Sequence, residues 1–274
     1  MLPSIIILGG LGLLFGVGLY IASKLFHVPI DPRVSKVESA LPGANCGACG
    51  LAGCGGFARA IVHGSADIAG CLPGGEDVVH AVAAIMGVEA VAVEKNVAVL
   101  MCQGRNVKER FEYTGIKTCR TASLIHNGPR ECLYGCVGYG DCASICPFDA
   151  LHMVDGWPVV DEQKCTACGK CVVVCPKDLF SLHGIKSFVH VRCKSLDSGK
   201  VTRKACSLGC IGCKRCEKEC PFDAVHVIDN LAVFDYEKCT SCGKCVNVCP
   251  TKTITNERSS RKELGIFPLK KENV

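Results

Sequence analysis

Cysteine spacing is the feature of this sequence that most directly predicts chemistry. Three segments carry the pattern C-x-x-C-x-x-C-x-x-x-C-P, in which three closely spaced thiols are followed by a fourth directly before proline. This spacing is typical of [4Fe-4S] clusters, because three thiolates bind three corners of the cube and the fourth reaches a neighbouring cluster. A structural zinc site needs only two C-x-x-C pairs. The runs are Cys165, Cys168, Cys171 and Cys175; Cys210, Cys213, Cys216 and Cys220; and Cys239, Cys242, Cys245 and Cys249.

The cysteine-rich part of the chain is an internal duplication. Segment 142–176 aligns with 216–250 without a gap, at an offset of 74 residues, and 21 of 35 positions are identical. We therefore expect two units with two clusters each, one over 126–185 and the other over 206–255. Exchange of the fourth ligand predicts three regular sites. These are Cys210, Cys213, Cys216 and Cys249; Cys220, Cys239, Cys242 and Cys245; and Cys146, Cys165, Cys168 and Cys171.

The remaining site of the first unit lacks one ligand. Tyr139 stands at the position that corresponds to Cys213, whereas Cys132 stands opposite Cys206. We expect Cys132 to replace the missing ligand. Cys206 would then be a spare thiol beside a complete site, either a buried free cysteine or an exchangeable ligand. The predicted irregular set is Cys132, Cys136, Cys142 and Cys175.

Another group of four cysteines lies in a glycine-rich segment, 40–75. Its spacing is C-x2-C-x4-C-x16-C, and the glycines allow the backbone to approach a bound group closely. Four cysteines without histidine suit a cubane cluster or a zinc ion, and spacing alone leaves both open. The residues are Cys46, Cys49, Cys54 and Cys71.

The segment 76–125 is expected to be a small α/β connection, with helical periodicity at 76–86 and a strand toward 91–101. It contains Cys102, and Cys119 in a stretch expected to be a loop, and neither matches a cluster spacing. Buried free thiols are the favoured interpretation. A weaker hypothesis joins these two cysteines with Cys193 and Cys206.

Residues 1–26 predict a transmembrane anchor. The run 5–22 has no charged residue, and roughly 17–25 apolar residues cross a bilayer. A cleaved signal peptide is disfavoured because no Lys or Arg precedes the run. Positive charge follows from Lys24 onward, which places the N-terminus outside. Thiolate–iron chemistry also needs a reducing compartment, so we expect a single-pass protein of the cell inner membrane with its bulk in the cytoplasm.

Three further segments are expected to lie outside the cluster domains: a linker at 27–39, a basic linker at 186–205 and a mobile tail at 256–274. The formal charge of +5 does not indicate nucleic acid, because the basic residues are not interleaved with stacking aromatics. A basic surface near a redox centre would instead steer an acidic partner, although a solvated linker explains the same charges equally well.

Each unit has a predicted hairpin, because Asp155-Gly156 and Asp229-Asn230 are turn dipeptides between β-rich runs. Helices are expected after the CPFDA and CP turns. The expected fold class is α+β, with a single N-terminal transmembrane helix, a small four-cysteine cluster domain and two tandem bicluster ferredoxin-like domains.

The residues support one-electron transfer and no second chemistry. The sequence has no glycine-rich nucleotide loop after a strand and no convincing catalytic base. Successive clusters on a membrane anchor are best read as a wire between a soluble donor and a membrane partner. A zinc-bearing scaffold is the competing hypothesis from another class.

Several segments together resemble the B subunit of the Rnf complex, over nearly the whole chain. They are the apolar N-terminal helix, GANCGACGLAGCGGFARAI, CVGYGDCASICPFDA and CSLGCIGCKRCEKECPFDA. The resemblance implies a [4Fe-4S] cluster on the four cysteines of 40–75, and hence five clusters in all. It also implies a subunit of a translocase-type, ion-pumping ferredoxin:NAD+ oxidoreductase, with reduced ferredoxin as donor and NAD chemistry on another subunit.

On this basis we expect ferredoxin to dock near the basic C-terminal half. Electrons would pass through the second unit, the first unit and the cluster of 40–75, and then enter other subunits of the complex. The alternative within the same class is a membrane-anchored polyferredoxin subunit of a hydrogenase or formate dehydrogenase.

Overall fold

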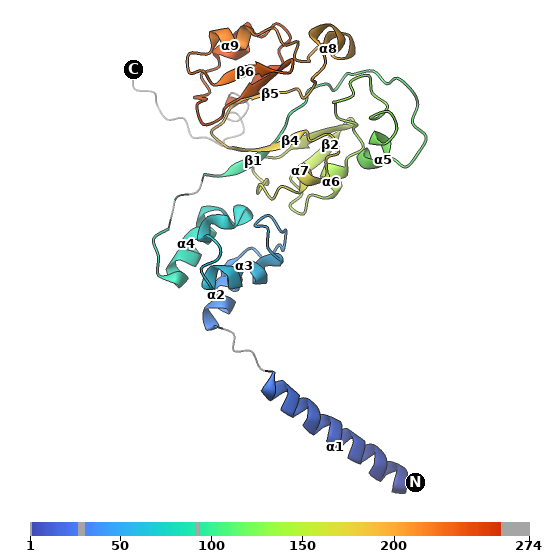
Figure 1. Ribbon diagram of the computed structural model, residues 1–274, viewed down its shortest axis with the longest axis vertical. Helices are drawn as coiled ribbons and strands as arrows, with labels where there is room; N and C mark the ends of the chain where they lie inside the picture. The colour runs from blue at the N-terminus through green and yellow to red at the C-terminus, as the bar shows by residue number, and fades with distance from the viewer. Residues whose placement is uncertain (1, 27–30, 91, 93, 259–274) are drawn as a thin grey trace.

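The structure is a computed structural model that describes residues 2–26, 31–90, 92 and 94–258. A long helix, a small helical module and two β-containing units follow one another along the chain (Figure 1).

Helix α1 (Leu2–Leu25) is apolar on all sides. The window Ile6–Leu25 has a mean hydropathy of 2.1, and none of it is buried against the rest of the chain. An isolated helix with apolar residues all round is typical of a membrane span. Among the described residues it is the one helix long and apolar enough to cross a bilayer.

The helical module consists of α2 (Pro32–Ala40), α3 (Gly53–Val62), the 3-10 turns η1 (Ile68–Gly70) and η2 (Leu72–Gly74), and α4 (Gly75–Met86). Val34 and Val37 lie on one face of α2 and pack against Phe57 and Ile61 of α3. The predicted linker at 27–39 is therefore wrong from residue 32 onward, and residues 27–30 lie outside the described part. Helix α4 also packs into this core through Val82, so the module extends beyond the predicted boundary at residue 75.

The first unit contains β1 (Asn96–Leu100), α5 (Cys119–Ser123), α6 (Asp141–Ser144), β2 (Leu151–Val154), β3 (Trp157–Val160), α7 (Lys170–Val174) and β4 (Phe180–Gly184). Strands β2 and β3 form the predicted hairpin, and β1 pairs antiparallel with β4. The first unit thus begins at its strand β1 and not at residue 126, because the two ends of the unit pair with each other.

The second unit repeats this plan with β5 (Val189–Val191), α8 (Gly199–Ala205), α9 (Arg215–Glu219), β6 (Val225–Ile228), β7 (Leu231–Phe234), α10 (Lys244–Val248) and β8 (Ile254–Asn256). Strand β5 pairs with β8, and Val189 and Val191 are buried in the core. The basic segment 186–205 is therefore part of the second unit and not a linker. Residues 259–274 of the predicted tail lie outside the described residues.

The short helices lie before the Cys-Pro pairs, and the prediction that they follow these turns is wrong. Strands β2 and β6 follow the CPFDA turns. Proline disfavours the helical conformation in the preceding residue, so each helix ends before its Cys-Pro. Cys175, Cys220 and Cys249 are accordingly extended, with ψ of 112°, 112° and 111°. This turn separates the fourth cysteine from the helix that carries the third.

The two units are joined directly. Only residues 185–188 connect β4 with β5. The rings of His183, from the first unit, and Tyr236, from the second, lie 4.0 Å apart between centroids. His190 is fully buried beside them, with Nδ1 3.0 Å from the Tyr236 hydroxyl. Stacked, buried rings favour one fixed arrangement of the units.

Candidate iron–sulfur sites

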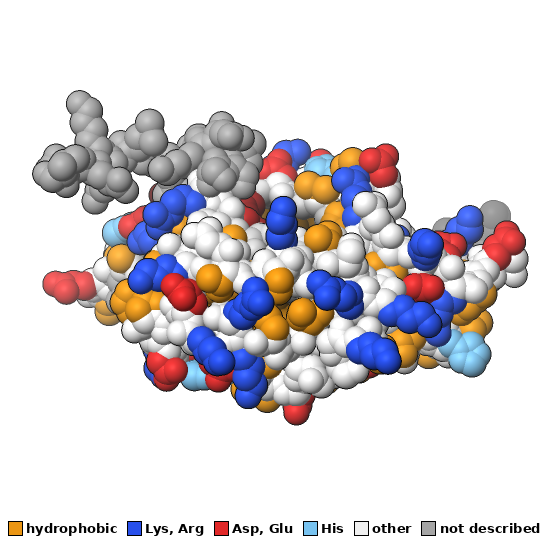
Figure 2. Space-filling model, turned by 90° about the horizontal axis from the view of Figure 1, so that it is seen from above, with side chains coloured by type: hydrophobic (Ala, Val, Ile, Leu, Met, Phe, Trp, Pro, Cys, Tyr) orange, Lys and Arg blue, Asp and Glu red, His pale blue; other side chains and the backbone are white. Residues whose placement is uncertain are grey.

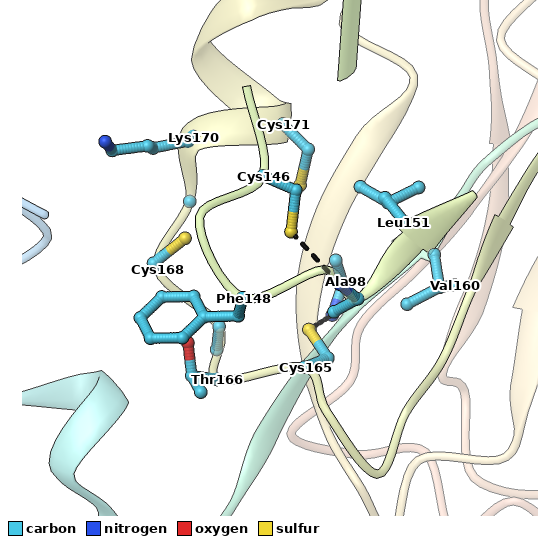
Figure 3. Close-up of a pocket in the computed structure, with 13 residues that line it drawn as sticks. Ala98, Cys146, Phe148, Leu151, Val160, Cys165, Thr166, Cys168, Lys170 and Cys171 are labelled. Carbon is cyan, nitrogen blue, oxygen red and sulfur yellow. Dashed lines mark hydrogen bonds between the residues drawn. The ribbon is translucent and has the colours of Figure 1, made fainter. Parts of the chain in front are cut away.

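The regular set of the first unit surrounds a single hollow. Cys165, Cys168 and Cys171 come from the loop and first turn of α7, and Cys146 comes from the CPFDA turn (Figure 3). The hollow has an empty volume of about 350 Å³, and its other walls include Phe148, Leu151 and Val160. Four thiols around an apolar hollow suit a cluster, which needs four ligands and exclusion of water.

Backbone amides are directed at these sulfur atoms. Ala150 N–H donates to Cys146 Sγ at 3.4 Å, and Ala98 N–H donates to Cys165 Sγ at 3.4 Å. The second unit repeats the first of these bonds, from Ala224 N–H to Cys220 Sγ at 3.3 Å. Hydrogen bonds to cluster sulfur atoms are one of the means by which a protein sets the reduction potential.

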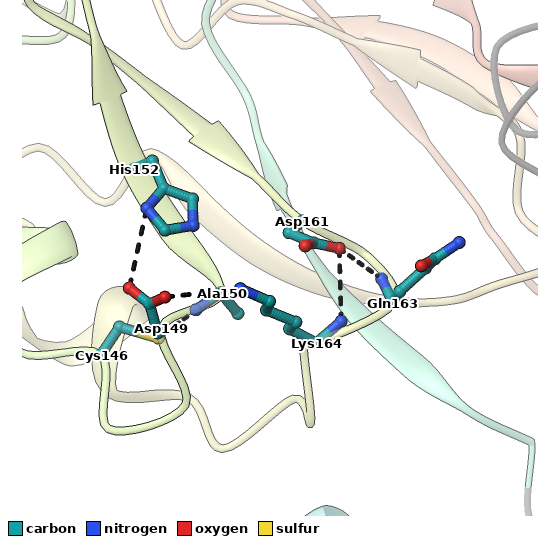
Figure 4. A network of polar contacts seen from close by, with 7 residues as sticks. All are labelled: Cys146, Asp149, Ala150, His152, Asp161, Gln163 and Lys164. Atoms are coloured by element: carbon teal, nitrogen blue, oxygen red, sulfur yellow. Dashed lines mark hydrogen bonds and ion pairs between the residues drawn. The ribbon is translucent and has the colours of Figure 1, made fainter.

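A polar network fixes the turn that carries Cys146 (Figure 4). The backbone of Asp149 has a φ of 49°, and its carboxylate lies 3.4 Å from Lys164 Nζ and 3.7 Å from His152 Nδ1. Asp161 accepts the N–H of Gln163 at 2.9 Å, which shapes the loop leading to Cys165. His152 lines none of the cysteine hollows and belongs to this network, so it has a structural place in the fold.

The second unit brings its two regular sets together in the predicted way. Cys220, Cys239, Cys242 and Cys245 line a hollow with an empty volume of about 300 Å³. In the other set, burial and the neighbouring thiols Cys210, Cys213 and Cys249 raise the pKa of Cys216 to about 11. Cys213 and Cys242, one from each set, are the only two exposed residues among the 24 cysteines, all of which lie in the described ranges.

The helical module also gathers its four cysteines. Burial raises the pKa of Cys71, and Cys54, Cys46 and Cys49 raise it further through their nearby charge. Asn45 adopts a positive φ of 45° and its Oδ1 accepts the N–H of Cys54 at 2.8 Å, which fixes the start of α3. A side chain at Gly53 would collide with Asn45, since its Cβ would lie 2.5 Å from Oδ1.

The irregular site of the first unit differs from the sequence prediction. Its hollow has an empty volume of about 370 Å³ and is lined by Cys136, Cys142, Cys175 and Cys119. Cys119 begins α5 and is not in a loop. Asp141 holds α5 against the site, because its carboxylate accepts the N–H groups of Cys119 at 3.0 Å and Arg120 at 3.1 Å. Cys119 therefore stands where Cys132 was expected.

Cys132 lies elsewhere, and its predicted place in the irregular set is wrong. It lines a separate hollow together with Cys102, Cys193 and Cys206, between the two units. The weaker hypothesis for these cysteines is right about Cys102, Cys193 and Cys206 and wrong about Cys119. A further signal in the sequence is numerical, since 24 cysteines divide into six groups of four.

No three His, Cys, Asp or Glu side chains among the described residues converge closely enough to hold a single metal ion. The thiols instead stand apart around hollows. This spacing suits a four-iron cube better than one zinc ion, whose Zn–S bonds are about 2.3 Å long.

Three family models match the chain. A model for a putative Fe-S cluster matches residues 41–73, a 4Fe-4S binding domain matches 158–180 and a 4Fe-4S dicluster domain matches 209–254. The first match favours iron over zinc for the four cysteines of the helical module.

Three curated relatives are similar over most of their length, and each is the B subunit of a membrane complex. That of the Na(+)-translocating ferredoxin:NAD(+) oxidoreductase complex of Acetobacterium woodii is 48% identical, over 92% of this chain and 76% of the relative. That of the ion-translocating oxidoreductase complex of Methanosarcina acetivorans is 44% identical, over 93% and 97%. That of the proton-translocating ferredoxin:NAD(+) oxidoreductase complex of Clostridium ljungdahlii is 42% identical, over 89% and 88%.

An apolar anchor helix followed by successive four-cysteine sites defines the class of membrane-associated iron–sulfur electron carriers. Identity above 40% along nearly the whole length places the chain within one family of that class. The chain belongs to the B subunits of the Rnf-type, ion-translocating ferredoxin:NAD+ oxidoreductases. The resemblance seen in the sequence is thereby confirmed.

Proposed function

We propose that this chain takes electrons from reduced ferredoxin and passes them, through [4Fe-4S] clusters, to the membrane subunits of an ion-translocating ferredoxin:NAD+ oxidoreductase. Each transfer oxidises the donor cluster by one electron and reduces the acceptor cluster by one. NAD+ reduction takes place on another subunit. The names of the relatives support this function, whereas they differ in the ion, Na+ in one and protons in another.

Five ligand sets carry this proposal. They are Cys46, Cys49, Cys54 and Cys71; Cys146, Cys165, Cys168 and Cys171; Cys119, Cys136, Cys142 and Cys175; Cys210, Cys213, Cys216 and Cys249; and Cys220, Cys239, Cys242 and Cys245.

The observation that carries the proposal is the succession of these sets. Cys46 of the helical module is close enough to raise the pKa of Cys168, after burial as the main cause. Cys142 likewise contributes to the raised pKa of Cys171, again after burial, which joins the two sites of the first unit. Neighbouring clusters of this kind support electron transfer from one site to the next toward the module beside α1.

The positive-inside rule and the need for reduced thiols both support a cytoplasmic position for everything after α1. Ferredoxin would then meet the chain in the cytoplasm, and electrons would leave it at the membrane.

The test is to purify the full chain without oxygen and mix it with reduced ferredoxin. We expect about four iron atoms in each site, hence at least about 20 per chain, and loss of visible absorption as the clusters are reduced. A colourless protein, or one that holds iron but is not reduced by ferredoxin, would contradict the proposal.

We propose the second unit as the docking site for ferredoxin. Exposed cations gather on α8 and around α9, and Figure 2 shows Lys and Arg spread over the face seen from above. The exposed Cys213 and Cys242 belong to the same unit, so its clusters are accessible to a donor. Basic surfaces accelerate association with acidic partners.

Reversing Lys200, Arg203 and Lys204 to Glu should slow reduction by ferredoxin about tenfold at low salt and flatten its dependence on ionic strength. Stopped-flow absorbance measures both. The control reverses Lys108 and Lys117, two exposed lysines of the first unit. Iron content checks the fold, because Glu in the last turn of α8 opposes the helix dipole. Equal rates in both variants would remove the docking site from the second unit.

A further inference from the structure

The hollow between the two units is lined by four cysteines that no ferredoxin spacing uses. Its empty volume is about 350 Å³, within the range of the three cysteine hollows inside the units, which are about 300, 350 and 370 Å³. Apart from Arg192 and Lys194, no charged side chain among the described residues lines it. The four residues are Cys102, Cys132, Cys193 and Cys206.

Each unit contributes an equivalent pair to this hollow. Cys102 lies two residues after the end of β1, and Cys193 lies two residues after the end of β5. Cys132 and Cys206 both open the sequence C-x-x-G-C. In both, the glycine N–H donates to the carbonyl oxygen of that cysteine at 3.2 Å, so the two turns have the same hydrogen bond.

Thiols from different units approach each other at Gly104. A Cβ placed on this residue would lie 3.4 Å from Cys206 Sγ and 3.8 Å from Cys102 Sγ. The two sulfur atoms therefore flank one point, although they belong to different units. Gly104 leaves the space between them open.

Arg192 holds the two halves of the hollow together. It follows β5 in the second unit, yet its Nη1 donates to the carbonyl oxygen of Leu100 at the end of β1. It also donates to Thr255 Oγ1 at 3.2 Å and forms an ion pair with Glu257. These contacts fix Cys193, next to Arg192, relative to Cys102, two residues beyond Leu100.

A second contact across the units comes from the residue beside Cys102. Gln103 Nε2 donates to the carbonyl oxygen of Lys252 at 2.7 Å. The four thiols are thus held by contacts from both sides. Preorganised ligands of this kind are what a metal site requires.

We propose that Cys102, Cys132, Cys193 and Cys206 bind a further [4Fe-4S] cluster, which bridges the two ferredoxin units and carries electrons between them. The cluster accepts one electron from a reduced cluster of the second unit and gives one electron to the first unit, so no other reactant is needed. Its role as a bridge rests on the proposed function, whereas its existence as a cluster does not.

The neighbours of the bridging thiols support this path. Burial raises the pKa of the Cys102 thiol to about 11, and the backbone N–H groups of Cys136 and Gly104 oppose this rise. The N–H of Cys210 acts on Cys193 in the same way. Cys136 and Cys210 are proposed ligands of the adjacent sites in the first and second units. The bridge therefore contacts the next site on each side directly.

The test compares Cys132→Ala, Cys206→Ala and the double variant in the full chain, purified without oxygen. We expect the wild type to hold about 24 iron atoms, from six sites of four. Each single variant should hold about 20, and so should the double variant, because both cysteines serve one cluster. Ser207→Ala, an exposed neighbour of Cys206, is the control and should keep the full content.

Three results would overturn the site: about 20 iron atoms in the wild type, no loss in Cys206→Ala, or one zinc ion per chain in place of the missing iron. A loss of about eight iron atoms in the double variant would show two separate sites and would also contradict it.

The role as a bridge has its own readout. After rapid mixing of Cys206→Ala with reduced ferredoxin, freeze-quench electron paramagnetic resonance should show reduced clusters of the second unit and oxidised clusters in the remainder. Reduction of all clusters at the wild-type rate would remove the bridge and leave the ferredoxin reaction intact. If ferredoxin reduces neither protein, the proposed function fails, while the iron count still decides whether the site exists.

Discussion

Replacing Cys54 by Ala is expected to abolish ferredoxin-dependent NAD+ reduction by the assembled complex. Cys54 belongs to the cluster set of the helical module, which lies between α1 and the first unit. Loss of this ligand should remove about four iron atoms per chain. Electrons would still enter the second unit, so ferredoxin should reduce the remaining clusters at the normal rate.

Two measurements on the same preparation check this result: NADH formation in the purified complex and stopped-flow reduction of the chain by ferredoxin. His63→Ala is the matched control, because His63 is exposed just after α3 in the same module. If NAD+ reduction persists in a complex that has lost the Cys54 cluster, electrons leave the chain from another site.

Replacing Cys119 by Ala should remove a different cluster, that of the irregular site in the first unit. The expected loss is again about four iron atoms, because α5 can supply no substitute thiol once Cys119 is gone. Arg120→Ala keeps the thiol and the contact of Asp141 with the backbone of α5, and it should retain all the iron.

Combining variants separates the two assignments of Cys132. The double variant Cys119→Ala, Cys132→Ala should lose about eight iron atoms, since the two residues serve different clusters. A loss of about four, with Cys119→Ala alone unchanged, would restore Cys132 to the irregular site and leave Cys119 as a free thiol.

Local spacing explains which sites could be predicted. Cys165, Cys168 and Cys171 lie on one loop and one helical turn, so their convergence is decided within seven residues. The fourth ligand follows from the internal duplication and from the extended cysteine before proline. Cys119 gives no such signal, because it reaches its site only through the contact of α5 with Asp141.

The ends of the units could not be predicted for a similar reason. Strand β1 pairs with β4, across more than 80 residues of sequence, and nothing near β1 indicates that partner. The basic residues of 186–205 favour a solvated linker when they are considered alone, although Val189 and Val191 within this segment are buried. Surface charge on a short strand and helix does not distinguish a folded segment from a linker.

The matching pairs of cysteines have a consequence for how this chain gained a longer path. One copy of the ferredoxin unit has two thiols, one after its first strand and one in its C-x-x-G-C turn, which is half of what a cube requires. Two copies in the arrangement fixed by Arg192 complete the set, so doubling the unit yields a binding place that neither copy has alone. Tandem duplication here would add not only a second length of wire but also the splice that joins it to the first.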